Sequence, residues 1–430
     1  MVNNHCFWLK NAHVPNCLIN NQVPSHTKDN LSLCDLEIRD GKIFQIIPAS
    51  TDTIGQDLKK GIVLPCFVDV HTHLDKGHIC DRTPNLEGNF NTALEKAKED
   101  AQFWDEEDLY KRMEFGLKCS YAHGTIAIRT HLDSFGEQGY TTIKVWQKLK
   151  QEWADKITLQ AVSLVSLDYF CTPAGIKLAD KIAEIGGILG GVVYMNPNIE
   201  QELETVFRLA QDRNLDLDFH ADENGDMNSI CLQKIAQTAL KTNFTGNILC
   251  GHCCSLAVQS STQVSKTIEL VKQANIDVVS LPMCNLYLQD RKPHQTPLWR
   301  GVTRVKELKQ AGVKVAFASD NCRDPFFGFG DHDMLEVFSQ SVRIAHLDTP
   351  YEDWIASVTT IPANLMKLPN LGQITPNSPA DLILFKGRSF SELLSRHQCD
   401  RTLLRAGKIV EPELPDYSEL DNLINFQCPK

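Results

Sequence analysis

The chain has 430 residues, and its 42% hydrophobic and 23% charged content is typical of a globular protein with a sizeable core. Its net charge of −11 provides no basic field for nucleic acid or an anionic membrane, and no apolar run approaches the ~20 residues of a membrane span. The start of the chain lacks the features of a secretory leader, and the fifteen cysteines are expected to be reduced thiols. We therefore expect a cytoplasmic protein without nucleic-acid or membrane partners.

Short β-like runs occupy both ends of the chain. Residues 33–38 and 42–47 flank Asp40-Gly41, a strong signal for a hairpin turn. Near the other end, residues 380–385 are predicted to form a strand, and residues 405–410 one arm of a hairpin. Together these patterns predict a small β-sandwich built from residues 1–61 and 370–430.

The middle of the chain alternates between strand-like and helical patterns, which predicts a (β/α)8 TIM-type barrel over residues 62–369. A doubly wound open sheet is the alternative, but no glycine-rich phosphate turn follows the first predicted strand. The eight predicted strands span residues 62–71, 125–131, 157–165, 190–194, 215–220, 247–252, 276–281 and 313–319. The predicted helices include residues 107–121, 178–185, 199–213, 232–240, 265–274 and 302–311.

Four histidines and one aspartate stand at the C-terminal ends of these predicted strands, where barrel enzymes place their active sites. His71 and His73 are two residues apart and therefore share one face of a strand end. His220 and His252 end two further strands, and Asp320 follows the last one. Three imidazoles and a carboxylate suit zinc or iron(II) with an open position for water. The predicted ligands of this single divalent ion are His71, His73, His220 and Asp320.

Two further side chains are candidates for catalysis. Glu223 lies three residues after His220 and could carry a proton from water to a ring nitrogen and the leaving group. A solvated loop carboxylate, beside Asp222, is an equal alternative for it. His252 is either a fifth metal ligand or a group that polarises the substrate, and Asp320 could also accept the proton of the attacking water. Several other histidines are interpreted as core or surface residues: His78, His123, His294, His332, His346 and His397.

In combination, these motifs resemble the amidohydrolase superfamily, most closely the bacterial cytosine deaminases and related heterocycle aminohydrolases. The similar segments are HTH at 71–73, RTHLD at 129–133, HADE at 220–223, GHC at 251–253 and SDN at 319–321. The resemblance implies a mononuclear metal site on the four predicted ligands, with Glu223 as proton shuttle and His252 as a catalytic histidine. Residues 190–195 lack the strand-4 lysine that bridges two metals in binuclear relatives, which favours one ion and deamination.

The positions that would read the substrate depart from cytosine deaminase. Ser166 stands where that family carries a glutamine, and a serine cannot offer the paired donor and acceptor of an amide. Asn321 replaces a second carboxylate, and Phe326 replaces another aromatic residue. Lys76 could contact a polar or anionic substituent of the substrate. A surface lysine, or a lysine in a salt bridge to Asp75, is an equally good interpretation. Four further residues could wall the pocket, although core packing is their default: Phe90, Leu132, Tyr287 and Trp299.

We therefore predict metal-dependent hydrolytic deamination of a small aminated heterocycle, which is cytosine or a related pyrimidine, purine or triazine. Hydrolysis of a cyclic amide or another non-peptide C–N bond on the same site is the first alternative. A non-catalytic amidohydrolase-like binding protein is another, and a redox or zinc-storage role for the thiols, such as Cys250-x-x-Cys253, is the third. A homo-oligomer is compatible with the sequence, which does not itself specify one.

Overall fold

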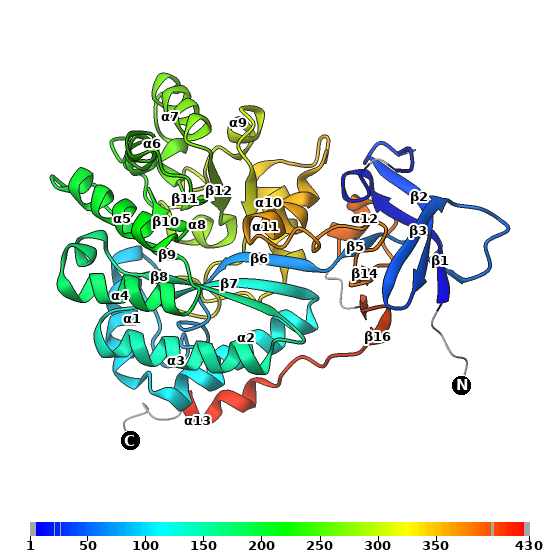
Figure 1. The fold of residues 1–430 in the computed structure, drawn as a ribbon, viewed down its shortest axis with the longest axis horizontal. Helices are drawn as coiled ribbons and strands as arrows, with labels where there is room; N and C mark the ends of the chain where they lie inside the picture. Colours follow the sequence, from blue (N-terminus) through cyan, green and yellow to red (C-terminus); the bar gives the residue numbers. More distant parts are fainter. Residues whose placement is uncertain (1–5, 21, 26, 397–399, 425–430) are drawn as a thin grey trace. The chain divides into compact units, whose positions relative to one another are not determined.

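The computed structural model describes residues 6–20, 22–25, 27–396 and 400–424, and its chain divides into two compact units (Figure 1). The first unit consists of Met1–Val68, Tyr121–Ala127 and Met334–Leu414, and the second of Asp69–Ser120, Ile128–Asp333 and Pro415–Lys430. Among the described residues, no helix combines the length and the apolar character needed to cross a membrane.

The first unit contains two four-stranded sheets, with strand orders β3-β2-β1-β4 and β16-β15-β14-β5. Arg39 pairs with Lys42 across Asp40-Gly41, which confirms the predicted hairpin. Asp40 and Gly41 both adopt positive φ, as the tight turns favoured between twisted strands require. The strands are β1 (Cys6–Pro15), β2 (Leu31–Arg39), β3 (Lys42–Pro48), β4 (Gln56–Asp57), β5 (Val63–Pro65), β14 (Leu382–Leu384), β15 (Thr402–Arg405) and β16 (Lys408–Val410).

Apolar side chains from both sheets, such as Leu9, Leu36, Leu382 and Leu404, form one buried cluster in this unit. Burial of these side chains is the main term that stabilises the unit. One detail of the prediction was wrong, because residues 405–410 are not a single arm. They contain the turn at Ala406-Gly407, which separates β15 from β16. The helices of this unit are α10 (Met334–Ala345), α11 (Thr360–Leu365) and α12 (Phe390–Leu394).

The second unit has an α/β architecture. Five parallel strands follow the order β13-β12-β11-β10-β9, and three more, of which β6 and β7 begin in the first unit, follow the order β6-β7-β8. Isolated parallel bridges join Val162 to Ile188, Ser166 to Val192, and Thr72 to Asp320. Each predicted strand overlaps an observed one. These are β6 (Phe67–Thr72), β7 (Thr125–Asp133), β8 (Thr158–Leu164), β9 (Leu189–Val193), β10 (Leu217–Ala221), β11 (Ile248–His252), β12 (Ile276–Ser280) and β13 (Val315–Phe317).

The first predicted strand, residues 62–71, is not continuous. Its beginning forms β5 in a sheet of the first unit, and after Cys66 the chain continues as β6 beside β7. The apolar character of the run does not reveal this break, because both parts are fully buried, but Pro65 stands directly before it.

Helices alternate with the strands of the second unit, and α3 to α7 lie outside β7 to β12 (Figure 1). Two of these helices begin at a capping side chain, which accepts a hydrogen bond from a backbone N–H of the first turn. Thr172 caps α4 in this way, and Ser260 caps α7. The bounds are α1 (Phe90–Asp100), α2 (Glu106–Ala122), α3 (Gly136–Glu152), α4 (Pro173–Glu184), α5 (Ile199–Arg213), α6 (Cys231–Thr242), α7 (Ser261–Gln273), α8 (Pro282–Leu288), α9 (Val305–Gln310) and α13 (Asp421–Ile424).

Candidate active site

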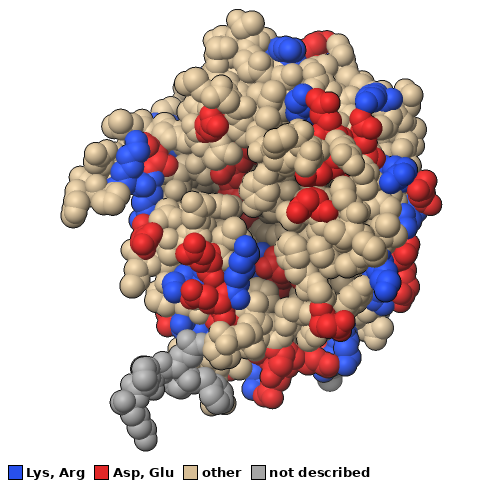
Figure 2. Space-filling view, turned by 90° about the vertical axis from the view of Figure 1, so that its left-hand side faces the viewer, with Lys and Arg blue, Asp and Glu red and all other residues tan. Residues whose placement is uncertain are grey.

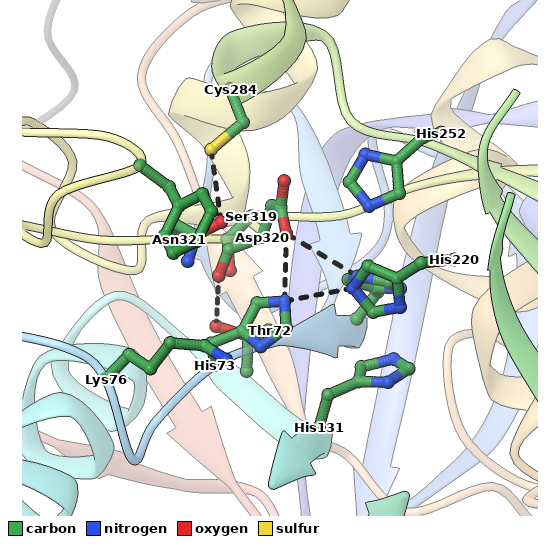
Figure 3. A network of polar contacts seen from close by, with 12 residues as sticks. Thr72, His73, Lys76, His131, His220, His252, Cys284, Ser319, Asp320 and Asn321 are labelled. Atoms are coloured by element: carbon green, nitrogen blue, oxygen red, sulfur yellow. Dashed lines mark hydrogen bonds and ion pairs between the residues drawn. The ribbon is translucent and has the colours of Figure 1, made fainter. Parts of the chain in front are cut away.

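Three imidazoles and one carboxylate meet in the second unit (Figure 3). His71 belongs to β6 and His73 follows it directly, whereas His220 lies in β10 and Asp320 follows β13. Asp320 Oδ1 is 3.5 Å from His71 Nε2 and 3.2 Å from His73 Nε2, and His73 Nε2 is 3.3 Å from His220 Nε2. One ligand atom from each residue lies within 4.8 Å of the others, so the four side chains could hold a single metal ion.

The backbone at the ends of β6 and β13 fixes this arrangement. The N–H of Asp320 donates to the carbonyl of His71 at 2.9 Å, and the N–H of His73 donates to the carbonyl of Asp320 at 3.2 Å. The Thr72 hydroxyl donates to the same Asp320 carbonyl at 2.8 Å. Asp320 has a φ of +63°, a conformation that costs a non-glycine residue about 1–3 kcal/mol. Such strain is typical of residues held in place for a function.

The donor set fits a divalent ion. Within the described part of the chain, both carboxylate oxygens of Asp320 are buried without a hydrogen-bond partner, and so is His71 Nε2, which lies 3.5 Å from one of them. Burial lowers the pKa of His73 to about 4 and that of His220 well below its usual range, so both rings are neutral, the form that binds metals. Burial alone would raise the pKa of Asp320, but the imidazoles of His252 and His71 hold it well below its usual range.

His131 also belongs to this cluster, although no role was predicted for it. Its ring centroid lies 4.0 Å from that of His71 and 4.7 Å from that of His220. A second group of potential ligands, His71, His131 and Asp218, shares His71 with the first. Asp218 is held by Arg129, whose Nη1 donates to it at 2.9 Å. The signal was present in the sequence, because His131 ends the second predicted strand as His220 ends the fifth.

Glu223 and His252 lie together beside Asp320, and the His252 ring centroid is 4.8 Å from that of His220. His252 Nδ1 is 3.2 Å from Glu223 Oε1 and 3.0 Å from Asn285 Nδ2. Burial, and next the charge of Asp320, raise the pKa of Glu223 well above its usual range, which favours its protonated form. His252 has a φ of +68°, and its Nε2 has no hydrogen-bond partner among the described residues. Glu223, His252 and Asp320 form a further group of converging polar atoms.

A cavity of about 380 Å³ opens beside these side chains, and all four residues predicted to bind substrate line it. Phe90, predicted as a wall residue, also lines it, whereas Leu132, Tyr287 and Trp299 are not among its lining residues. On the face drawn in Figure 2, basic and acidic side chains are interspersed around a central hollow. The cavity wall includes His73, Lys76, Phe90, Ser166, His220, Glu223, His252, Asp320, Asn321 and Phe326.

Polar and aromatic contacts fix the substrate-facing side chains. The Phe326 ring packs edge-on against Phe90, with centroids 5.6 Å apart. Lys76 Nζ lies 2.5 Å from Asp133 Oδ1 and 6.0 Å from the Phe326 centroid. Burial lowers the pKa of Lys76, but Asp133 and neighbouring carboxylates more than offset this and raise it, so the ammonium stays charged. Asn321 Nδ2 donates to a carboxylate on its own loop at 2.6 Å.

The chain is similar in sequence to a known protein family and to proteins of known activity. The model of an amidohydrolase family matches residues 115–410. A pterin deaminase of Rhizobium rhizogenes is 46% identical over 423 residues, which cover 97% of both chains. An N-isopropylammelide isopropyl amidohydrolase of Pseudomonas sp. is 25% identical over 71% of this chain and 75% of that protein.

Among solved structures, a 5-methylcytosine deaminase from Klebsiella pneumoniae, bound to 5-fluorocytosine, superimposes with a TM-score of 0.82. The two are 25% identical, and the alignment covers 95% of this chain and 98% of the other. The resemblance inferred from the HTH, HADE, GHC and SDN motifs is thereby confirmed. The chain belongs to the amidohydrolase family and is a hydrolase of carbon–nitrogen bonds other than peptide bonds.

Proposed function

We propose that this enzyme hydrolyses the exocyclic amine of a pterin-like bicyclic heterocycle and releases ammonia. Hydrolytic deamination of a heterocycle is the reaction supported by its relatives, and the 46% identity with a pterin deaminase favours a pteridine over a single ring. The observation that carries the proposal is the cluster of three imidazoles and a carboxylate beside a cavity of about 380 Å³. A cavity of this size belongs to the range that encloses small ligands.

His71, His73, His220 and Asp320 are the proposed ligands of one divalent ion, which is zinc or iron(II). Neutral imidazoles with one carboxylate match the preferences of both metals, and the unpartnered polar atoms support a bound cation. When bound, the ion supplies positive charge that brings the pKa of water near neutrality. His131 packs against two of these rings and is proposed to keep their orientation.

Glu223 is the proposed proton carrier. Its raised pKa allows it to donate its proton to a ring nitrogen, then to take one proton of the attacking water and pass it to the leaving amine. Asp320, whose Oδ1 faces His71 and His73, accepts the other proton of the water and returns it to Glu223, so both carboxyl groups end in their starting states. His252 Nε2 is assigned to stabilise the oxygen that adds to the ring carbon. The net change exchanges the C–NH2 bond for a C–O bond and expels ammonia.

The cavity wall provides both flat and polar contacts for a ring. Phe90 and Phe326 are proposed to pack against its face, and Ser166 and Asn321 to contact its polar edge. Lys76 remains charged and is proposed to contact an electronegative or anionic substituent. Ser166 and Asn321 are smaller or less charged than the cytosine-deaminase residues they replace, which agrees with a different ring.

We also propose that β6 to β13 close into a (β/α)8 barrel. The three isolated bridges support this closure, because they join β8 to β9 and the end of β6 to Asp320. The shared buried cluster supports a β-sandwich of the two smaller sheets. The domain division at residues 62 and 369, a cytoplasmic location and a homo-oligomer remain proposals from the sequence.

A substrate panel tests the function. Zinc-loaded and iron-loaded protein is incubated with pterin, 5-methylcytosine, an aminotriazine and a cyclic amide without an exocyclic amine, and ammonia release is measured. We expect the highest kcat/KM with pterin. Turnover of the cyclic amide alone would support the alternative C–N hydrolysis, and binding of pterin without turnover by either metal form would support a non-catalytic relative.

A further inference from the structure

A second group of potential metal ligands lies outside the catalytic cluster. His78, Cys322 and His332 each offer a ligand atom within 4.8 Å of the other two, and all three side chains are buried. The side chain of His78 is buried deeply, at 4% exposure, and neither of its ring nitrogens has a hydrogen-bond partner in the described part of the chain. An imidazole buried with both nitrogens unsatisfied is costly, and native proteins rarely leave it so.

The neighbouring backbone makes room for this cluster. Gly116 lies inside α2, where glycine destabilises a helix by about 1 kcal/mol relative to alanine. A Cβ at this position would lie 3.0 Å from His332 Nε2 and 3.1 Å from Leu74 Cδ2. The glycine therefore keeps space for the His332 ring. His78 and His332 also adopt positive φ, at +64° and +54°, so two strained residues converge on one thiol.

We propose that His78, Cys322 and His332 bind a second divalent ion of the zinc class, with a structural role. Two imidazoles and a thiolate are typical zinc ligands, and the fourth position of a tetrahedral site falls to water or a neighbouring group. The cluster belongs to neither the catalytic ligand set nor the cavity wall. This inference does not depend on which heterocycle the enzyme deaminates.

Such an ion would join the two segments that carry the catalytic ligands. His78 lies five residues after His73, and Cys322 lies two residues after Asp320. Their backbones already pair, because the N–H of His78 donates to the carbonyl of Cys322 at 3.2 Å. The N–H of Cys80 donates to Arg323 in the same way at 2.9 Å. A shared ion would cross-link these segments and hold Lys76 and Asn321 at the cavity.

Cobalt distinguishes the two sites, because only the second one contains a sulfur ligand. Metal-depleted protein is loaded with zinc for metal analysis and with cobalt(II) for absorption spectroscopy. We expect two zinc ions per chain and a thiolate-to-cobalt charge-transfer band in the near ultraviolet. C322A should lose one zinc ion and the band, whereas H220A should lose one zinc ion and keep the band. C34A removes another buried thiol and serves as the control that keeps both ions and the band.

H78Q provides a test that retains the thiol, in case C322A does not fold. It should weaken the zinc-induced rise in melting temperature measured in the H220A background, and it should shift or abolish the cobalt band. One zinc ion per chain without a thiolate band in the wild-type protein would overturn the proposal. A band that persists unchanged in C322A and H78Q would also overturn it, since another thiol would then bind the cobalt.

Discussion

The second unit contains two clusters of potential metal ligands, the catalytic cluster and the cluster of His78, Cys322 and His332. Both take residues from the same two segments of the chain. The segment after β6 supplies His73 to the catalytic cluster and His78 to the second cluster, and the segment after β13 supplies Asp320 and Cys322. The catalytic cluster borders a cavity, whereas none of the three residues of the second cluster lines it. Buried polar atoms without hydrogen-bond partners therefore indicate a metal site, whereas the presence of a neighbouring cavity indicates whether that site is catalytic or structural.

Removing a catalytic ligand should have the largest effect and should separate the two clusters. In H220A, the catalytic ion loses one of its imidazoles, and we expect deamination to fall by more than the roughly 10²- to 10⁴-fold that a single acid–base residue contributes. Steady-state ammonia release and metal content measure this. Retention of most activity in H220A would contradict the ligand assignment.

Replacing Glu223 by glutamine should have the next largest effect. E223Q keeps the shape of the side chain and can no longer exchange a proton, so kcat should fall by roughly 10²- to 10⁴-fold while both ions stay bound. The matched control is D226N, an exposed loop carboxylate three residues later, which should leave kcat unchanged. If E223Q and D226N behave alike, Glu223 is only a solvated carboxylate.

Asp324 lies two residues after Cys322 and should make stability depend on pH. Burial raises its pKa to about 7, although Asn321 and two backbone N–H groups donate to it and lower the pKa. Since the unfolded carboxyl ionises near pH 4, the free energy of unfolding should fall as pH rises from about 4 to about 7, by at most about 1.4 kcal/mol per unit of pKa difference.

D324N cannot ionise, so its stability relative to the wild-type protein should increase across that pH window. Urea unfolding at several pH values measures the difference. The two curves would run parallel if the Asp324 carboxyl titrated at its ordinary pKa in the folded protein.

The smallest effect is expected at the substrate edge. S166A removes one hydroxyl from the cavity wall, and kcat/KM should fall by about 2- to 10-fold, the value of one ordinary hydrogen bond, without loss of metal. S163A, three residues earlier and within β8, is the control, because the Ser163 hydroxyl donates to the Gly190 carbonyl and does not line the cavity. Equal effects of both substitutions on KM would remove Ser166 from the binding site.

Some features of this protein follow from local patterns. The alternation of apolar runs and helical segments predicted every strand from β6 to β13, because strand and helix periodicities differ along the sequence. Chemistry at the strand ends predicted the convergence of His71, His73, His220 and Asp320. His131 stands at the end of a predicted strand in the same way and therefore belongs to the same pattern.

Other errors arose where the surrounding pattern outweighed a weak local signal. The break at Cys66 between β5 and β6 follows Pro65 within an apolar run, and the turn at Ala406-Gly407 contains a glycine within a β-like segment. His78 and His332 were interpreted as core or surface residues because each stands alone in its sequence context. Short helices such as α8 were also absent from the prediction, since seven residues give a weak periodic pattern.

The sequence by itself determined the reaction chemistry of this protein, because ligand types, their order and their positions after apolar runs are local properties of the chain. Only the tertiary structure decided which polar groups share a site. Side chains separated by 254 positions, His78 and His332, become neighbours through chain folding alone. The cavity also depends on long-range packing. Only the folded chain therefore shows that the catalytic cluster borders a cavity and the second cluster does not.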